Sequence, residues 1–483
     1  MTALDEARAR VREVASAELV ERLEHLDATR ARRPRDDDPP RAPDRGAVTD
    51  CDVALVGGGL SLLIAPVLAA KGLRVTVFER ARAGTAHREW NASDPELRAL
   101  VRAGVVTELE LQSLVIARYR HGVCRWHEGG TYPVTGVLDR AVDAGALLSL
   151  VRLRAESLGV RFFDGHELVG HAEGYDAIAL RFRHDGARTD VTAKAMLDAR
   201  GAGSPSATAD LLCPTVGGVL EGVAVGDAPD EVDPTVGEIL VTTEGVEDQR
   251  QHIWEAFPAG PRRTTVYLFF YDRAERVGDG ALLQLYARFF ATLPRFKRGD
   301  ITLERPTFGY IPGWSRLTPP PSPPSPRVVL VGDAAARHSP LTYCGFGAML
   351  RSFTGVADKV AAAIHRGPTG FAELGSVVHD APLHAGTGAL AHMIASPPTD
   401  PSRANELNRL LDAAFGTLHA MGDEAYGALL RDEMSAGDLV KFLQRTSLKH
   451  PRVYPEVLRV LGAGGVSRWG LEVARGLVRS VAK

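Results

Sequence analysis

The sequence has 483 residues, more than one compact core usually holds, so we expect two linked domains and a terminal extension. Its 57 Lys and Arg against 60 Asp and Glu give a net charge of -3, which argues against a surface that attracts nucleic acid. Four cysteines without a Cys-x-x-Cys pair fit neither a zinc site nor a disulfide framework, and a reducing cytoplasm is the simplest location.

The first 50 residues predict an extension outside the main fold. Residues 1–30 place Leu, Val and Ala at helical spacing among many charges, which is typical of an amphipathic helix lying on the main body. Their early acidic residues argue against a secretory signal. Residues 31–50 bring an acidic run and several prolines, so we expect a flexible, solvated linker.

Residue 51 begins a βαβ pattern, which opens an expected nucleotide-binding domain over residues 51–204. An apolar strand ends in three glycines, a helix runs to Ala70, and a second strand ends at Glu79. The charge-free stretch from 53 to 70 is long enough to cross a bilayer, but glycines and a proline interrupt it. A strand, a turn and a helix explain this stretch better.

The glycine turn predicts a dinucleotide site. At Gly57, Gly58 and Gly59 the backbone can approach a pyrophosphate at the start of a helix. Glu79 follows at the distance where a carboxylate accepts hydrogen bonds from an adenosine ribose. The third glycine of the Gly-x-Gly-x-x-Gly pattern falls at Leu62, so the alternative is a tight βαβ turn that binds no ligand.

Residues 205–326 predict a second domain built on a β-sheet, which would receive the substrate. Strand-like runs such as EILVTT and TTVYLFFYD fill it, and a proline-rich stretch ends it as an extended crossing. Residues 327–370 would return to the first domain. Residues 371–483 predict helices, of which 453–481 form either an amphipathic surface or an ordinary packed helix.

The returning segment carries a second and stronger signal. Gly332 and Asp333 directly follow an apolar strand, Pro340 comes next, and Gly345 and Gly347 open a helix. In flavoproteins of the hydroxylase class such an aspartate binds the ribityl chain, and the helix N-terminus faces the flavin pyrimidine. An N-capped turn is the alternative, but it leaves the distant βαβ unit unexplained. We therefore predict that FAD lies between the two segments.

With these residues in view, the chain resembles the CruA/CruP-type lycopene cyclases, which are relatives of geranylgeranyl reductases and aromatic hydroxylases. The resemblance runs almost end to end and implies an α/β, two-domain, FAD-binding fold of the hydroxylase-like, Rossmann type, with a β-sheet substrate domain and a helical C-terminal region. It also implies a long isoprenoid substrate and peripheral association with the inner face of the membrane. The segments that carry it are REWN (88–91), CPTVGG (213–218), WEAFPAG (254–260), TTVYLFFYD (264–272), FGYIPGW (308–314) and GDAAARHSPLTYCGFGAMLR (332–351).

Such an enzyme would cyclise a carotene end group by acid and base chemistry, without net oxidation. FAD would act in reduced form, with NADPH as a possible reductant, and would face the developing cation. The acid must stay protonated in apolar surroundings, and Glu255 in WEAFPAG suits this best because it alternates with Trp254 and Ala256 along a strand. A position on the solvent face of that sheet is the alternative. The histidines share no ligand pattern, so we expect no metal.

Two further acids are candidates. Glu89 in REWN lies near where the loop after the second strand would reach the flavin, and Arg88 could pair with it or contact the cofactor, although a purely local Arg-Glu pair is the alternative. Asp272 ends an aromatic strand and ranks third. Two other functions stay open: a redox flavoprotein, either an isoprenoid reductase or a monooxygenase, and a flavoprotein that binds carotenoid without cyclising it.

Overall fold

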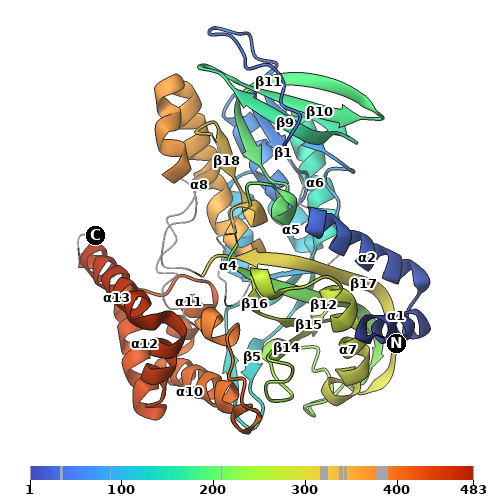
Figure 1. Cartoon of the computed structure of the whole chain (residues 1–483), viewed down its shortest axis with the longest axis vertical. Coiled ribbons are helices and arrows are strands. Elements are labelled where there is room, and N and C mark those ends of the chain that lie inside the picture. The colour runs from blue at the N-terminus through green and yellow to red at the C-terminus, as the bar shows by residue number, and fades with distance from the viewer. Residues whose placement is uncertain are drawn as a thin grey trace.

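The computed structural model describes residues 2–32, 36–86, 89–207, 209–315, 325–336, 341, 345–376 and 390–481. Two sheet-based parts lie one above the other, the first at the top of Figure 1 and the second at the bottom. Helices cover both parts, and those of the C-terminal region lie beside the second. This is the α/β, two-domain architecture with a helical C-terminal region that the sequence predicts.

The first sheet has seven strands within the described residues. They are β1 (Cys51–Val56), β2 (Val75–Glu79), β8 (Arg161–Asp164), β9 (Glu167–Glu173), β10 (Ile178–His184), β11 (Ala187–Asp198) and β18 (Val328–Leu330). Their order is β8-β2-β1-β11-β10-β9, with β18 also paired to β11. The pairs β8 with β2, β2 with β1, β1 with β11 and β11 with β18 are parallel, whereas β9, β10 and β11 are antiparallel.

Strand β1 is buried on both faces, which explains its apolar run from Val53 to Val56. Val53 and Leu55 face a core shared with helices, while Ala54 and Val56 face a second core beneath β9 and β10. The helices and 3-10 turns of the first core are η1 (Leu60–Leu63), α3 (Ile64–Ala70), α4 (Asp94–Arg102), α5 (Glu108–Leu114), α6 (Ala144–Ser157), α8 (Gly345–His365) and η5 (Pro368–Ser376).

The second sheet has eight strands in the part of the chain that the structure describes. They are β5 (His121–Arg125), β6 (Thr131–Val134), β12 (Leu211–Val223), β13 (Val236–Val241), β14 (His252–Pro258), β15 (Arg263–Phe270), β16 (Asp272–Arg273) and β17 (Gly299–Gly313). Their order is β16-β12-β15-β14-β13-β5-β6, with β17 also paired to β12. The hairpin of β5 and β6 joins this sheet because β5 pairs with β13, although we expected residues 51–204 to stay within the first domain.

A small sheet lies between the two parts. It consists of β3 (Glu89–Ala92), β7 (Arg140–Asp143) and β4 (Val115–Arg118), in the order β3-β7-β4. Trp90 of β3 packs against the first core, and its ring lies 4.8 Å from that of Phe346 at the start of α8. Glu89, on the other face of the same strand, contacts β15 and β17 of the second sheet. Strand β3 therefore connects the two domains.

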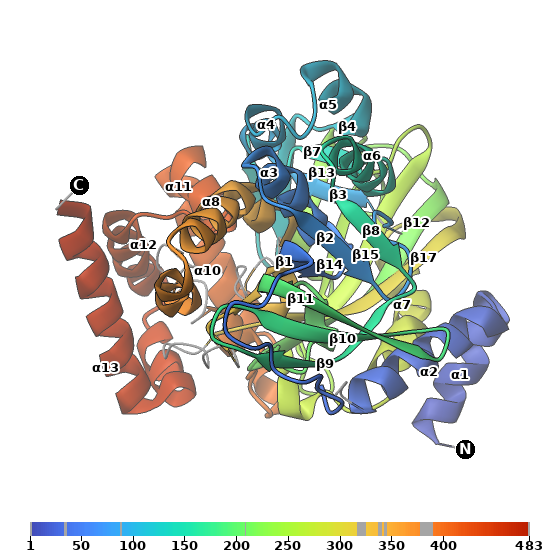
Figure 2. The ribbon, with the colours of Figure 1, turned by 90° about the horizontal axis from the view of Figure 1, so that it is seen from above.

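Residues 1–30 form two helices, α1 (Ala3–Val14) and α2 (Ala17–Arg32), instead of the single helix expected. Both pack with α7 (Ala281–Phe296) on one face of the second sheet (Figure 2), where Val11 and Leu23 enter a core with Phe289. Asp27 of α2 accepts a hydrogen bond from Tyr310 of β17. The extension therefore completes a core of the second sheet.

The linker expected over residues 31–50 is, from residue 36 onward, a bound segment, and its description as flexible and solvated is wrong there. Asp36 pairs with Arg200 at 2.9 Å and with His171 at 3.1 Å. Burial alone would raise the pKa of Asp36, but hydrogen bonds from His171 and Arg200 lower it to about 2. The acidic run compensates basic side chains of the first sheet, and composition alone does not show such partners.

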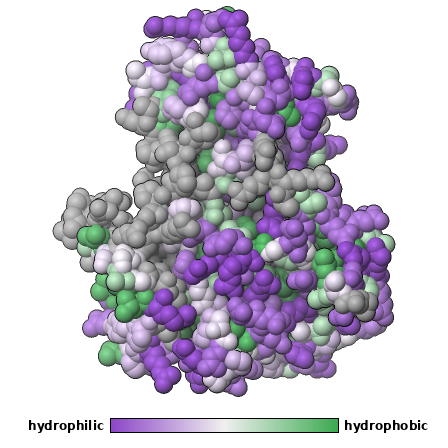
Figure 3. All heavy atoms as spheres, viewed as in Figure 1, coloured by the Kyte–Doolittle hydropathy of each residue, from purple (hydrophilic) through white to green (hydrophobic). Residues whose placement is uncertain are grey.

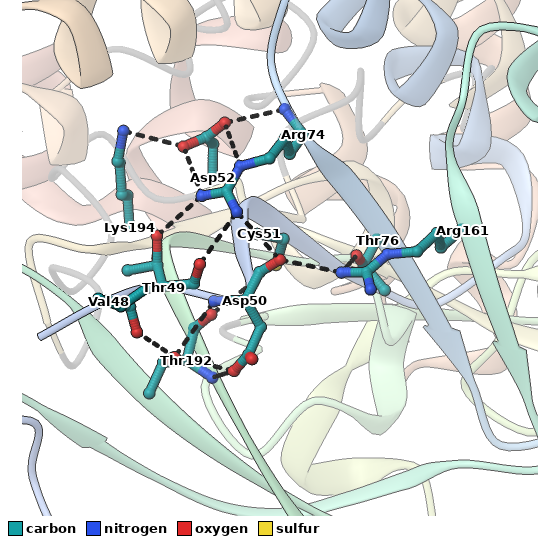
Figure 4. Close-up of polar contacts among 10 residues, drawn as sticks. All are labelled: Val48, Thr49, Asp50, Cys51, Asp52, Arg74, Thr76, Arg161, Thr192 and Lys194. Carbon is teal, nitrogen blue, oxygen red and sulfur yellow. Dashed lines mark hydrogen bonds and ion pairs between the residues drawn. The ribbon is translucent and has the colours of Figure 1, made fainter.

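The end of this segment is held at the start of β1, as Figure 4 shows. The carboxylate of Asp50 accepts from the backbone N–H and the hydroxyl of Thr192, both at 2.8 Å. Arg74 donates to the backbone oxygen of Thr49 at 3.0 Å and contacts Asp52. These contacts tie the segment to β11 and to Arg74, the residue that precedes β2.

The C-terminal helices cover the other face of the second sheet. They are α10 (Glu406–Met421), α11 (Asp423–Leu430), α12 (Ala436–Lys449) and α13 (Val453–Val481). Phe415 and Leu429 share a core with Ile253 and Phe257 of β14. No helix within the described residues is long and apolar enough to cross a membrane.

Candidate functional site

Four loops meet at one edge of the first sheet because β1, β2, β11 and β18 run parallel. Gly57 follows β1, Glu79 ends β2, Ala199 follows β11 and Gly332 lies just beyond β18. The carboxyl ends of parallel strands are the usual ligand-binding edge of such a sheet. The two motifs, which are far apart in the sequence, therefore lie side by side.

The first two glycines are required by the close packing of this turn. Gly57 has φ +115°, and a Cβ there would lie 2.3 Å from the backbone oxygen of Ala199. A Cβ on Gly58 would lie 2.4 Å from that of Ala83. Gly59 differs, because it is exposed and no atom lies within 4 Å of its Cβ position. It precedes η1, and no side chain caps this helical end, so the first N–H groups of η1 have no side-chain partner at the cap.

Glu79 lies against the same turn. Its Oε2 accepts from the backbone N–H of Gly58 at 2.7 Å, and its Oε1 accepts from that of Ala81 at 2.9 Å. The carboxylate is half-buried and keeps further acceptor positions. The turn and the carboxylate together fit the pyrophosphate and the ribose of a dinucleotide.

The second segment contacts the first directly. Gly332 has φ +59°, and a Cβ there would lie 2.8 Å from the hydroxyl oxygen of Ser61. Asp333 lies beside the start of α8, with its Oδ1 3.7 Å from the Cβ position of Gly345. Leu62, at the place of the missing third glycine, is fully buried in the first core. That departure from the pattern is therefore accommodated by packing.

Gly347 has a packing role that the sequence did not indicate. A Cβ there would lie 2.7 Å from Oε1 of Glu96 in α4. The buried carboxylate of Glu96 pairs with Arg351, which lies in α8 like Gly347. The glycine therefore leaves room for an ion pair that joins α8 to α4. Pro340 and Arg88, the remaining expected cofactor residues, lie outside the described residues.

Glu255 lies on the face of β14 that turns away from α7. Trp254 and Ala256 point into the core with α7, whereas Ile253 and Phe257 point the other way, so Glu255 shares the face of these two apolar residues. The expected alternation along the strand is therefore present, and this face is covered by protein, not by bulk solvent.

The surroundings of Glu255 favour its neutral form. Desolvation raises the pKa of its carboxyl to about 8, although a hydrogen bond from Asn91 acts in the opposite direction. Nδ2 of Asn91 donates to Oε1 of Glu255 at 3.2 Å, and the hydroxyl of Tyr119 donates to Oδ1 of Asn91 at 2.5 Å. With a pKa of about 8, roughly nine-tenths of the carboxyl is protonated at pH 7.

The other two candidate acids are held in ion pairs. Glu89 is buried, pairs with Arg305 of β17 and accepts from Thr265 Oγ1 at 3.4 Å. Its partner among the described residues is thus a distant arginine. Asp272 is 1% exposed and lies between two guanidinium groups, those of Arg250 at 3.3 Å and Arg276 at 3.2 Å. Both carboxylates thus join elements of the structure, and Glu255 differs from them in having no cationic partner in the described chain.

Sequence reasoning missed Asn91, Tyr119 and Arg305. Asn91 belongs to the REWN segment, but an amide has no acid or base function that would single it out. Tyr119 and Arg305 lie in segments that show no motif. Only their contacts with Glu255 and Glu89 reveal them.

No protein-family model matches this sequence, and no curated protein does either. Among solved structures, a geranylgeranyl bacteriochlorophyll reductase-like protein from Thermoplasma acidophilum has a TM-score of 0.60 at 16% identity, over 85% of this chain and 99% of that chain. Halogenase PltM, in complex with phloroglucinol and FAD, has a TM-score of 0.56 at 14% identity, over 87% of this chain and 96% of that chain. The flavin-dependent halogenase CmlS has a TM-score of 0.51 at 16% identity, over 90% of this chain and 78% of that chain. At these identities the similarity establishes a shared fold, the two-domain fold of FAD-binding proteins.

Proposed function

We propose that this protein binds FAD and acts as a lycopene cyclase-like enzyme on the end group of a linear carotene. The observation that carries the proposal is Glu255, a carboxyl without a cationic partner in the described chain and with a pKa raised to about 8. It lies among apolar side chains on the face of the sheet that turns toward β3. A neutral acid in such a place suits the protonation of an alkene.

The residues at the sheet edge would hold the cofactor. The turn at Gly57 and Gly59 would bind the pyrophosphate, Glu79 the adenosine ribose, and Asp333 the ribityl chain, with Gly345 at the helix end beside it. When bound in reduced form, FAD would supply negative charge and π density facing a cation, and NADPH is the reductant we expect.

The chain's own part of the reaction is a proton transfer. Glu255 gives its proton to the terminal double bond of the substrate, the ring closes through the resulting cation, and a carbon next to the cation returns a proton to the carboxylate of Glu255. The product is an isomer of the substrate, so no oxidant or reductant is consumed. Phe257 and Tyr267, whose ring centroids lie 6.1 Å apart on the same face as Glu255, help to exclude water from this step.

Expression in cells that accumulate lycopene tests the proposal. New monocyclic or bicyclic carotenes of unchanged mass would support it, and unchanged pigments in cells that contain the folded, flavin-loaded protein would overturn it. Glu255→Gln should abolish the conversion while FAD stays bound. Glu304→Gln is the matched control, because Glu304 is an exposed carboxylate that pairs with Arg263 on the same sheet.

A redox function is the second candidate, and the names of the structural neighbours favour it, since they include a reductase-like protein and flavin-dependent halogenases. A reductase or a monooxygenase would consume NADPH in proportion to product and would change the substrate's mass by hydrogen or oxygen. A cyclase needs reductant only in catalytic amounts. A protein that only binds carotenoid would hold the pigment unchanged.

For a substrate of this kind we propose peripheral contact with an anionic membrane through α12 and α13. Hydrophobic residues gather over these helices at the lower left of Figure 3. The exposed apolar side chains are Val440, Leu448, Tyr454, Leu458 and Leu471, and the exposed basic ones between them include Lys441, Arg445, Lys449 and Arg452. Apolar side chains interleaved with basic ones are typical of helices that lie on a lipid surface.

A further inference from the structure

Strand β3 presents different chemistry on its two faces. Trp90 and Ala92 contribute to the first core, and Trp90 lies against Phe346 at the start of α8. Glu89 and Asn91 point the other way, toward the second sheet. This alternation places Asn91 beside Glu255, on the same strand that packs on the segment expected to hold the flavin.

The orientation of the Asn91 amide is determined by its neighbours. Tyr119 donates its hydroxyl hydrogen to Oδ1 of Asn91 at 2.5 Å, so Nδ2 is the end of the amide that faces Glu255. Tyr119 is 4% exposed, and its ring packs on Gly237, where a Cβ would lie 2.9 Å from Cδ2 of the ring. The tyrosine is therefore held firmly, and so is the amide.

This arrangement distinguishes the two oxygens of Glu255. Oε1 accepts the hydrogen bond from Asn91, whereas no residue in the described ranges donates to Oε2. In the neutral carboxyl the acidic proton therefore belongs on Oε2, the oxygen that Asn91 leaves free. After the proton has left, the N–H of Asn91 stabilises the carboxylate, because hydrogen bonds to charged acceptors are the stronger ones.

We propose that Asn91, oriented by Tyr119, is a positioning residue that holds Oε1 of Glu255 and thereby presents the proton on Oε2 to the substrate. This inference rests on the proposed function of Glu255 as the acid. The strand keeps its place through contacts with both domains, since Glu89 pairs with Arg305 on one side and Trp90 packs against Phe346 on the other. Strand β3 thus fixes the position of Glu255 relative to the start of α8.

Asn91→Ala and Tyr119→Phe in the flavin-loaded protein test this inference. The titration of Glu255 is followed by the infrared band of its protonated carboxyl, identified by its loss in Glu255→Gln. Asn91→Ala should move the midpoint upward by about one pH unit, because the hydrogen bond that favours the carboxylate is lost. Tyr119→Phe should move it in the same direction by less, since the amide remains but can rotate.

Activity gives the second readout. The falling limb of the kcat profile should move to higher pH with the infrared midpoint in Asn91→Ala, and kcat at pH 7 should fall roughly tenfold with little change in KM, as a weaker acid requires. Tyr132→Phe is the matched control. It removes a tyrosine hydrogen bond to Asp412 of 2.6 Å, far from Glu255, and should leave both midpoints unchanged.

The outcomes separate this inference from the proposed function. If Glu255→Gln is inactive but Asn91→Ala and Tyr119→Phe titrate like the wild type, the positioning role is wrong and the acid role survives. If Glu255→Gln is fully active, the acid role is wrong, and with it the inference. If Asn91→Ala does not fold, the midpoint in Tyr119→Phe decides, and an unchanged midpoint there overturns the inference.

Discussion

The substitution Glu255→Gln tests the protonation of this half-buried carboxyl through stability, without any substrate. The pKa of Glu255 is about 8 in the folded protein, whereas the ordinary value of a glutamate, taken for the unfolded chain, is 4.5. Between these two pH values the folded protein therefore binds one more proton than the unfolded chain. The stabilisation is fully present below pH 4.5 and is lost as pH rises through about 8. A difference of about 3.5 between the two pKa values corresponds to about 5 kcal/mol.

Glutamine stays neutral at every pH, so the variant lacks this contribution to the pH dependence of the unfolding free energy. The difference in unfolding free energy between variant and wild type should therefore move in the variant's favour from pH 5 to pH 8 and level off above. The unfolding entropy of a chain of 483 residues is about 1 kcal/mol per kelvin, so the relative change in Tm is about 5 °C.

Thermal unfolding of both proteins from pH 5 to pH 9 measures this change, with Glu304→Gln as the control for an exposed carboxylate. Parallel curves for wild type and Glu255→Gln over this range would mean that Glu255 is already ionised at neutral pH. That result would refute the desolvation argument and remove Glu255 from the donor role.

Three further predictions concern other parts of the molecule. Gly57→Ala should abolish flavin binding, because its Cβ would lie 2.3 Å from a backbone oxygen, whereas Gly355→Ala, on an open helix surface, should keep the flavin absorbance of the purified protein. Asp36→Asn should lower the unfolding free energy at pH 7 by about 2 kcal/mol. Because the pKa of Asp36 is depressed in the folded protein, this loss should shrink as pH falls from about 3.8 toward 2, and unfolding of both proteins over this pH range measures the change. Leu448→Glu should reduce flotation with anionic vesicles several-fold, and equal flotation of variant and wild type would contradict the membrane surface on α12 and α13.

Local patterns in the sequence were enough to predict the edge of the first sheet. An apolar strand that ends in glycines has few folded alternatives, and Gly57 and Gly332 do lie at the ends of parallel strands, where Gly332 packs against Ser61 of η1. The alternation of Glu255 with Trp254 was predictable in the same way, because side chains of a strand point alternately to its two faces. The linker was mispredicted, because the acidic run that composition reads as solvated finds Arg200 and His171 on the folded sheet.

The sequence by itself determined the βαβ unit, the returning strand, the sheet-based second domain and the helical end, since each depends on hydrophobic periodicity and turn residues within a short stretch. Only the tertiary structure decided which side chains surround the acid. Asn91 and Glu255 are 164 residues apart, and the protonation of a carboxyl depends on the apolar groups and donors that folding brings to it. Such a site is a property of packing between distant segments, and no local pattern records it.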